Sequence, residues 1–242
     1  MRDVLVIGES CRDIFIYCDA NRLCPDVPVP VLNIVNQTEN GGMAKNVHRN
    51  ILTRIESCDI LTNTDWINVT KTRYVHNASN HMFFRVDSPN NIGKINLNEV
   101  DYDYKLIVIS DYDKGFLSES DIQTICENHD NVFIDSKKIL GDWASKAKFI
   151  KINDYEYKRS EKFISDELKS KIIHTMGGDG CKYQNKLYKV NKVDVKDTSG
   201  AGDSFLAGLV IEYLKSNDIE KSINFANKCA SEVVKHRGVT VI

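Results

Sequence analysis

A glycine-rich junction near the carboxyl end of the chain, VKDTSGAGDSFLAGL at residues 195–209, constrains the fold more than any other feature. Valines at 193 and 195 predict a strand, the glycines follow it, and apolar residues then recur at helical spacing. Backbone N–H groups at such a junction can converge on an anion, which the helix dipole also favours. Asp203 enters this positive region, where a carboxylate can stay ionised and accept a proton. An anion site beside a base is what phosphoryl transfer to a hydroxyl requires.

A glycine turn alone is a weak indication of function, since its ordinary interpretation is a tight turn with Asp203 as a helix N-terminal charge. The full string DTSGAGDSF is more specific. It resembles the signature D-T-x-G-A-G-D-x-F of the ribokinase-like (PfkB-type) carbohydrate kinases at every fixed position. The resemblance implies that Asp203 is the catalytic base and that the backbone of Gly200, Ala201 and Gly202 forms an anion hole.

The order of strands and helices supports the same fold class. Alternating buried strands and amphipathic helices predict an α/β protein. The resemblance covers nearly the whole chain and implies a three-layer α/β/α ribokinase-like fold, with a mostly parallel central sheet and a small β-sheet lid. We expect one kinase domain, residues 1–242, with lid strands from about residues 14–35 and 71–87. Because prolines confine a strand to a sheet edge, we expect two edge-type strands directly after the first strand.

Charge and composition exclude several classes of protein. A net charge of -2 and a pI near 6.3 give no electrostatic reason to expect nucleic acid or a membrane surface as partner. No apolar stretch approaches the roughly 20 residues of a membrane span, and the N-terminus does not read as a signal peptide. The seven cysteines are scattered and form no CxxC, so we expect reduced thiols in a cytoplasmic protein.

Four residues are candidates for binding the acceptor. Asp13 follows the first predicted strand, at the edge where open α/β sheets bind ligands, although a surface carboxylate is the alternative. Gly41 and Gly42 open a helix and let backbone approach a ligand closely, and Asn46 can hydrogen-bond hydroxyls. An ordinary glycine turn explains this second segment equally well from the residues alone. The family resemblance implies that all four residues bind a sugar.

Two further segments resemble one branch of the family, the bacterial D-glycero-D-manno-heptose-7-phosphate kinases. NRLCPDVPVPV (residues 21–31) is similar to S-R-x-S-P-E-x-P-V-P-V, and SDYDKG (residues 110–115) is similar to S-D-Y-x-K-G. Lys114 in the second segment either brings positive charge to a substrate phosphate or is a solvated lysine. The resemblance implies heptose 7-phosphate phosphorylated at the anomeric hydroxyl; fructose phosphate, ribose or a nucleoside is the alternative acceptor. The adenylyltransferase often fused to these kinases is not expected in this chain.

One pair of residues is a candidate for steering a metal. Asn153 and Glu156 match the family's N-x-x-E, whose glutamate steers magnesium and its waters. Magnesium keeps several waters and needs few protein carboxylates, so one glutamate acting through water is reasonable. The same spacing also fits a helix capping box.

A later loop is the candidate nucleotide site. Thr175, Gly177 and Gly180 match the family's T-x-G-x-x-G, and Asn227 corresponds to an asparagine at the adenine pocket. The resemblance therefore implies ATP and Mg²⁺ as cofactors. Some relatives also use a monovalent cation near the segment that corresponds to residues 237–240, a requirement that the sequence leaves open.

The chain departs from the family in one region. Only about ten residues separate Leu61 from Lys71, fewer than in a typical member. This favours a minimal kinase with a reduced sheet edge, and the alternative is a shortened, non-catalytic relative that binds sugar or nucleotide. A third possibility is an interaction module whose lid is a dimer surface. A homodimer through the lid is expected for an active kinase too.

Overall fold

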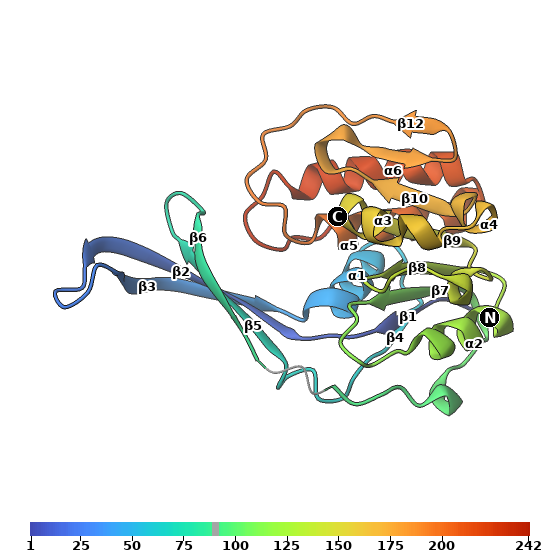
Figure 1. The fold of residues 1–242 in the computed structure, drawn as a ribbon, viewed down its shortest axis with the longest axis horizontal. Coiled ribbons are helices and arrows are strands. Elements are labelled where there is room, and N and C mark those ends of the chain that lie inside the picture. Colours follow the sequence, from blue (N-terminus) through green and yellow to red (C-terminus); the bar gives the residue numbers. More distant parts are fainter. Residues whose placement is uncertain (89–91) are drawn as a thin grey trace.

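The strands form two separate sheets in the computed structural model, which describes residues 1–88 and 92–242 (Figure 1). The larger sheet has eight strands in the order β12-β11-β10-β9-β8-β7-β1-β4, and the smaller sheet has four in the order β3-β2-β5-β6. The smaller sheet projects away from the body that contains the larger sheet.

The larger sheet is parallel except at one end. Its parallel strands are β1 (Arg2–Gly8), β4 (Cys58–Leu61), β7 (Tyr104–Asp111), β8 (Val132–Ser136), β9 (Phe149–Asn153) and β10 (Ile172–Thr175). The antiparallel hairpin of β11 (Cys181–Tyr183) and β12 (Lys186–Tyr188) completes it. The central strands are continuous apolar runs, as expected for strands that are covered on both faces.

Helices cover both faces of this sheet and make three layers. The helices are α1 (Gly42–Leu52), α2 (Glu119–Asn128), α3 (Asp154–Ser160), α4 (Asp166–Lys169), α5 (Ala201–Ser216) and α6 (Ile219–Val233), with short 3₁₀ turns η1 (Leu97–Glu99), η2 (Asp142–Ala144), η3 (Glu161–Phe163) and η4 (Gly177–Asp179). Val4 and Val6 of β1 face the cluster formed with α1, α5 and α6. Leu5 and Ile7 face the opposite cluster, which includes α2 and α4. The predicted three-layer α/β/α class is therefore confirmed.

The smaller sheet consists of β2 (Arg12–Leu23), β3 (Pro30–Asn40), β5 (Thr70–His76) and β6 (Met82–Asp87). Its register gives it two different faces, because side chains alternate along each strand. Asp13 aligns with Lys71 and Lys71 with Asp87, so this face carries ionised groups. Ile16 aligns with Tyr74 and Tyr74 with Phe84, so the other face is apolar.

Two expectations about strands were wrong. The edge position holds for β3, which begins at Pro30, but β2 is internal, because it pairs with β3 on one side and β5 on the other. No strand forms at residues 193–195. The N–H groups of Lys196 and Asp197 instead donate to the Val234 carbonyl at the end of α6, and Val195 is exposed. The segment before α5 is therefore hydrogen-bonded to the end of α6 and does not join a sheet.

Two observations bear on the expected surroundings of the protein. None of the helices in residues 1–88 and 92–242 combines the length and the apolar character of a membrane span. The seven cysteines are free thiols.

Candidate active site

The anion site that the sequence predicts would lie at the start of α5. Gly200 is the N-cap residue and has φ +77°, a left-handed conformation that suits glycine. A Cβ at this position would lie 3.1 Å from Asn46 Nδ2, so space as well as conformation requires glycine. Ala201 begins the helix, and Asp203 lies in its first turn with only 7% of its surface exposed.

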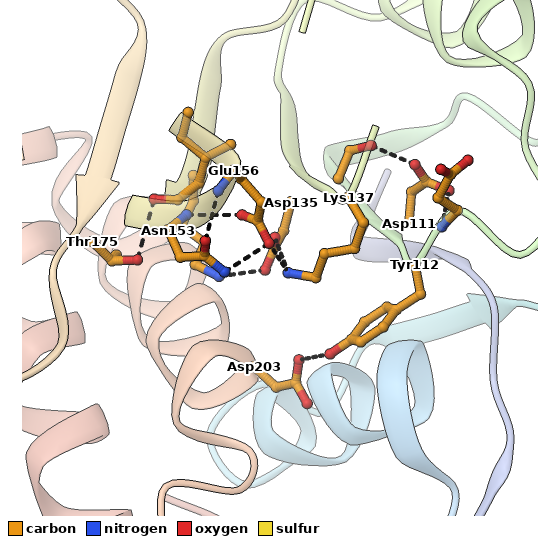
Figure 2. Close-up of polar contacts among 12 residues, drawn as sticks. Asp111, Tyr112, Asp135, Lys137, Asn153, Glu156, Thr175 and Asp203 are labelled. Carbon is orange, nitrogen blue, oxygen red and sulfur yellow. Dashed lines mark hydrogen bonds and ion pairs between the residues drawn. The ribbon is translucent and has the colours of Figure 1, made fainter. Parts of the chain in front are cut away.

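Two side chains from other elements hold the Asp203 carboxylate. Asn46 of α1 donates a hydrogen bond of 2.7 Å to Oδ2, and the Tyr112 hydroxyl donates one of 2.8 Å to Oδ1. Figure 2 shows the tyrosine reaching Asp203 from the loop that follows β7. Burial raises the pKa of Asp203, while the hydrogen bonds from Asn46 and Tyr112 act in the opposite direction. The carboxylate is therefore fixed in orientation and partly compensated for its burial.

A largely buried group of four charges, Asp135, Lys137, Lys151 and Glu156, lies beside this carboxylate, and Figure 2 labels Asp135, Lys137 and Glu156. Lys137 Nζ is 2.5 Å from Glu156 Oε1 and 3.5 Å from Asp135 Oδ1, and Lys151 Nζ is 2.6 Å from Asp135 Oδ2. Burial alone would raise the pKa of Asp135, but the two ammonium groups outweigh it and the pKa is lowered. Burial alone would lower the pKa of Lys137, but Asp135 and Glu156 raise it. Asp135 and Lys137 thus keep each other ionised.

Lys151 brings one of these charges to the anion site. A Cβ at Gly202 would lie 3.1 Å from Lys151 Nζ. The ammonium group therefore borders the N-terminus of α5, where backbone N–H groups without an intrahelical partner can bind an anion. The Ala201 N–H is an exception, because it donates to the Thr198 carbonyl at 3.2 Å.

A cleft of about 1060 Å³ extends from Asp203 to Asn227. Its lining includes the predicted loop residues Thr175, Gly177 and Gly180. Gly177 has φ +56° and an added Cβ would meet nothing within 4 Å, whereas a Cβ at Gly180 would strike the Tyr188 carbonyl at 2.1 Å. Asn227 Nδ2 donates to the Tyr188 carbonyl at 3.1 Å. The volume, the bare glycine loop and the ammonium groups at one end fit a nucleotide.

Asn153 and Glu156 do form the capping box that their spacing allows. The Glu156 N–H donates to Asn153 Oδ1 at 2.9 Å, and the Asn153 N–H donates to Glu156 Oε2 at 2.8 Å. Glu156 also lies beside Lys137, so the cap and a role at the site are compatible. Among the described residues, no cluster of three or more His, Cys, Asp or Glu side chains is placed to hold a metal. One carboxylate that contacts metal-bound water fits Mg²⁺ in this setting.

The residues predicted to bind the acceptor lie where the two sheets meet. Asp13 of β2 is almost fully buried and forms an ion pair with Arg73 of β5. Gly42 has φ +52°, and a Cβ there would lie 2.7 Å from Cys11 Sγ, while Gly41 is the N-cap of α1. Tight backbone packing therefore brings the start of α1 beside Asp13.

Two lysines near this region differ in their surroundings. Lys71 Nζ contacts Met43 Sδ at 3.1 Å and lies 5.2 Å from the centre of the Tyr112 ring, and no carboxylate of the described chain is within ion-pair distance of it. Burial lowers the pKa of Lys71, and the charge of Lys114 lowers it further. Lys114 lies on the loop after β7 and is half-buried, and its N–H donates to Glu9 Oε1 at 2.9 Å.

The sequence interpretation assigned no role to six residues of the site: Lys71, Arg73, Tyr112, Asp135, Lys137 and Lys151. Lys151 carried a recognisable signal, because a lysine inside an apolar strand must find a buried partner. Tyr112 directly follows the carboxyl end of a strand, which is where α/β sheets bind ligands. The contacts of Lys71 and Arg73 depend on strand pairing that sequence patterns do not specify.

The fold and this arrangement define a class of protein, the small-molecule kinases with α/β/α layers. The model of the pfkB family carbohydrate kinases matches residues 60–242, and the chain belongs to that family. The predicted family and the predicted protein class, a carbohydrate kinase, are thereby confirmed.

Curated relatives carry the name bifunctional protein HldE. The protein of Helicobacter pylori (strain G27) is 26% identical over 298 residues, covering 98% of this chain and 64% of the relative. That of a Nitratiruptor species is 26% identical over 283 residues, covering 96% of this chain and 61% of the relative. The chain thus spans less than two thirds of the length of these relatives.

Solved structures share the fold. Ribokinase from Thermotoga maritima superposes with a TM-score of 0.76 at 15% identity, covering 99% of this chain and 95% of that chain. Phosphofructokinase-2 from Escherichia coli, in complex with potassium, gives a TM-score of 0.70 at 14% identity, covering 100% and 95%. At these identities the similarity concerns the fold alone.

Proposed function

We propose that residues 1–242 act as one kinase domain that transfers the γ-phosphoryl group of ATP to a hydroxyl of a sugar phosphate. The observation that carries this proposal is the buried Asp203 carboxylate, held by Asn46 and Tyr112 at the N-terminus of α5. It combines a positioned base with an anion site, which direct phosphoryl transfer to a hydroxyl needs.

The transfer is a direct, in-line displacement. The acceptor oxygen forms a bond to the γ-phosphorus, the bond from that phosphorus to the bridging oxygen of ADP breaks, and the hydroxyl proton passes to Asp203. N–H groups of Gly200 and Gly202 would stabilise the negative charge on the transferred group, and the Lys151 ammonium beside Gly202 would support them. The Ala201 N–H, which the sequence assigned to the same role, donates instead to the Thr198 carbonyl at 3.2 Å. Bound Mg²⁺ supplies charge neutralisation at the phosphates. Glu156 would orient the metal through water.

The lining of the cleft indicates which residues would bind the cofactors. Thr175, Gly177, Gly180 and Asn227 would bind the nucleotide along it, and Asn153 would fix Glu156 at its phosphate end. Kinases of this family use ATP and usually Mg²⁺. The dependence on a monovalent cation stays open, although one structural neighbour is described in complex with potassium.

Lys71 supports a phosphorylated acceptor over a plain sugar. Its ammonium group is half-buried, with a thioether and an aromatic ring as neighbours and no carboxylate partner in the described residues. A partly desolvated cation of this kind favours an anionic ligand. Asp13, Gly41, Gly42 and Asn46 would bind the sugar hydroxyls, with the phosphate directed to Lys71 and Lys114.

Heptose 7-phosphate is the acceptor that we propose within this class. The support for this acceptor is that the NRLCPDVPVPV and SDYDKG segments resemble the bacterial heptose-phosphate kinases. Fructose phosphate, ribose and nucleosides remain the alternative acceptors.

One observation favours a second candidate, a shortened non-catalytic relative. The alignment with the H. pylori relative spans 298 positions, more than the 242 residues of this chain, so the relative has positions that this chain lacks. The connection from β4, an edge strand, to β5 is correspondingly short. The fully built surroundings of Asp203 weigh against this candidate.

The smaller sheet is proposed to act as a lid and as the surface of a homodimer. Its apolar face leaves Ile34 65%, Phe84 49% and Val86 53% exposed. Apolar side chains gathered on one sheet face indicate an interaction surface. A second copy of the chain, placed face to face, would cover them.

The function is tested by measuring ADP release with ATP, Mg²⁺ and a panel of acceptors: heptose 7-phosphate, sedoheptulose 7-phosphate, fructose phosphates, ribose and adenosine. Asp203→Asn serves as the blank. Turnover on a sugar phosphate, absent from the blank, is the expected result. Turnover on ribose or adenosine alone would refute the phosphate requirement, and intact ATP binding with no turnover on any acceptor would favour the non-catalytic relative.

A further inference from the structure

We propose that Tyr112 is a positioning residue for the reaction, whose hydroxyl fixes the Asp203 carboxylate in the orientation that accepts the acceptor proton. The proposal rests on the function proposed above. Tyr112 donates a hydrogen bond to one oxygen of the Asp203 carboxylate, Oδ1, and Asn46 donates one to the other oxygen, Oδ2. Two donors from two different elements fix the plane of the carboxylate. Each oxygen keeps a lone pair for the incoming hydroxyl.

The loop that carries Tyr112 is itself held in place. Glu9, at the end of β1, is fully buried and accepts the Tyr112 N–H at 2.7 Å with Oε2 and the Lys114 N–H at 2.9 Å with Oε1. The Asp113 N–H donates to Asp111 Oδ1 at 3.1 Å, and Asp111 also accepts the Ser136 hydroxyl. One buried carboxylate therefore anchors both sides of the turn, so the tyrosine is presented from a rigid segment.

The tyrosine ring is also flanked by two cations. Lys71 Nζ lies 5.2 Å and Lys137 Nζ 5.3 Å from the ring centre, distances at which an ammonium group is attracted to an aromatic face. Lys71 belongs to the acceptor side of the site and Lys137 to the nucleotide side. The phenol ring thus lies between the proposed acceptor site and the proposed nucleotide site, and its hydroxyl contacts Asp203, the proposed base.

Tyr112 is a donor over the working pH range. Burial raises the pKa of Tyr112 well above its ordinary value, and the nearby charge of Asp203 raises it further. The hydroxyl proton therefore stays on the tyrosine and points to the carboxylate. The titratable and charged groups that influence Asp203 are Cys11, Tyr112, Asp135, Lys137 and Lys151.

The test is Tyr112→Phe, which keeps the ring between the lysines and removes only the hydroxyl. We expect kcat/KM to fall roughly 10- to 100-fold, since a hydrogen bond to a charged group is lost. The loss should appear in kcat, with the acceptor KM changed less than about threefold, since the ring still fills its place. Because the hydrogen bond lowers the pKa of Asp203, its removal should move the acidic limb of the pH profile to higher pH.

Tyr104→Phe is the matched control. Tyr104 lies at the opposite end of β7 and donates a hydrogen bond of 2.7 Å to Asp59, so this variant removes the same kind of contact far from the site. Its kinetics and pH profile should equal those of the wild type. A Tyr112→Phe enzyme with wild-type kcat and an unmoved acidic limb would overturn the proposal.

A second readout separates this proposal from the proposed function. Carbon-13 NMR of the labelled Asp203 carboxyl follows its titration without any turnover, and the pKa should rise in Tyr112→Phe. If the wild type turns over no acceptor, the proposed function fails while the NMR titration still decides the role of Tyr112. If Tyr112→Phe does not fold, Glu9→Gln replaces it. That variant weakens the anchor of the loop and should move the titration in the same direction, and an unmoved titration would refute the proposal.

Discussion

Asn46 of α1 donates a hydrogen bond of 2.7 Å to Asp203 of α5, a residue that lies 157 positions further along the chain. The contact depends on the packing of these two helices. Asn50, one turn after Asn46, donates to the Asn46 carbonyl at 2.8 Å and accepts the Ile242 N–H at 3.1 Å. The position of the proposed base is thus set by the association of early and late parts of the chain.

Asn46→Ala should weaken catalysis because it removes a donor to an ionised carboxylate. A hydrogen bond to a charged group contributes about 1.5–3 kcal/mol, which corresponds to a loss of roughly 10- to 150-fold in kcat/KM. Steady-state ADP release measures this loss. Asn224→Ala on the exposed face of α6 removes an asparagine whose amide donates to the Glu220 carbonyl within the same helix, and it should leave kcat/KM unchanged. An Asn46→Ala enzyme within about twofold of the wild type would contradict the assignment.

Asp203→Asn should remove nearly all turnover while acceptor affinity stays within a few-fold. General base catalysis contributes about 10²- to 10⁴-fold, and the amide cannot accept the proton. Rates are measured by ADP release and affinity by calorimetry. Substantial residual activity would show that another group is the base.

The same substitution should stabilise the fold at neutral pH. Burial raises the pKa of Asp203 in the folded protein above its ordinary value. At pH values above the ordinary aspartate pKa, ionisation of this carboxyl therefore opposes folding. Asparagine removes that opposition, so the melting temperature should rise at neutral pH and differ little below the ordinary pKa of aspartate. A variant less stable than the wild type at neutral pH would contradict this account.

The sequence predicted the parts of the molecule that short, continuous patterns of residues encode. The glycines of the α5 junction and the apolar runs of β1 and β7 were evident, since each is encoded by neighbouring residues. The small second sheet was expected from β-rich segments together with the family resemblance, because the pairing of β2 with β5 joins distant residues. The strand expected at residues 193–195 failed because hydrogen bonds to Val234, distant in sequence, replaced sheet pairing. Tyr112 and Lys151 were missed because their partners, Asp203 and Asp135, are fixed only by the tertiary fold.

Gly200→Ala should destabilise the protein and disturb the site together. A left-handed conformation costs a residue with a Cβ about 1–2 kcal/mol, and this Cβ would lie 3.1 Å from both Asn46 Nδ2 and Val239 Cγ1. Urea unfolding should show at least that loss of stability, with a lower kcat as Asn46 shifts. Gly93→Ala is the control, because a Cβ at Gly93 would meet no other described residue within 4 Å and Gly93 has no left-handed φ, so its stability should stay within about 0.5 kcal/mol. Equal stabilities of the two variants would contradict the strain at Gly200.

Asp135→Asn should be strongly destabilising, because it leaves Lys151 buried without its carboxylate partner. Loss of one member of a buried ion pair costs about 3–5 kcal/mol. Because the lysines lower the pKa of Asp135, its stabilisation is present above the ordinary aspartate pKa and is lost as the pH falls through the lowered value. The wild type should therefore lose stability in acid more steeply than the variant, as followed by urea unfolding at a series of pH values.

Glu232→Gln is the control for that experiment. Glu232 at the end of α6 is 2.5 Å from Lys235, and both side chains are exposed, so solvent screens the pair and it contributes little to stability. If Asp135→Asn were as stable as this control, the buried group of four charges would not stabilise the fold.

Phe84→Glu should convert the proposed homodimer into a monomer. The register of the smaller sheet aligns Phe84 with Tyr74 and Ile16 on one face, and half of the Phe84 surface is exposed. A face-to-face dimer would bury it, and a carboxylate at that position would be desolvated without a partner. Light scattering after size-exclusion chromatography should report a dimer for the wild type and a monomer for the variant. Phe163→Glu, which changes an exposed phenylalanine of η3 in the main body, should remain dimeric. A monomeric wild type, or dissociation of both variants, would exclude the apolar face of the smaller sheet as the dimer surface.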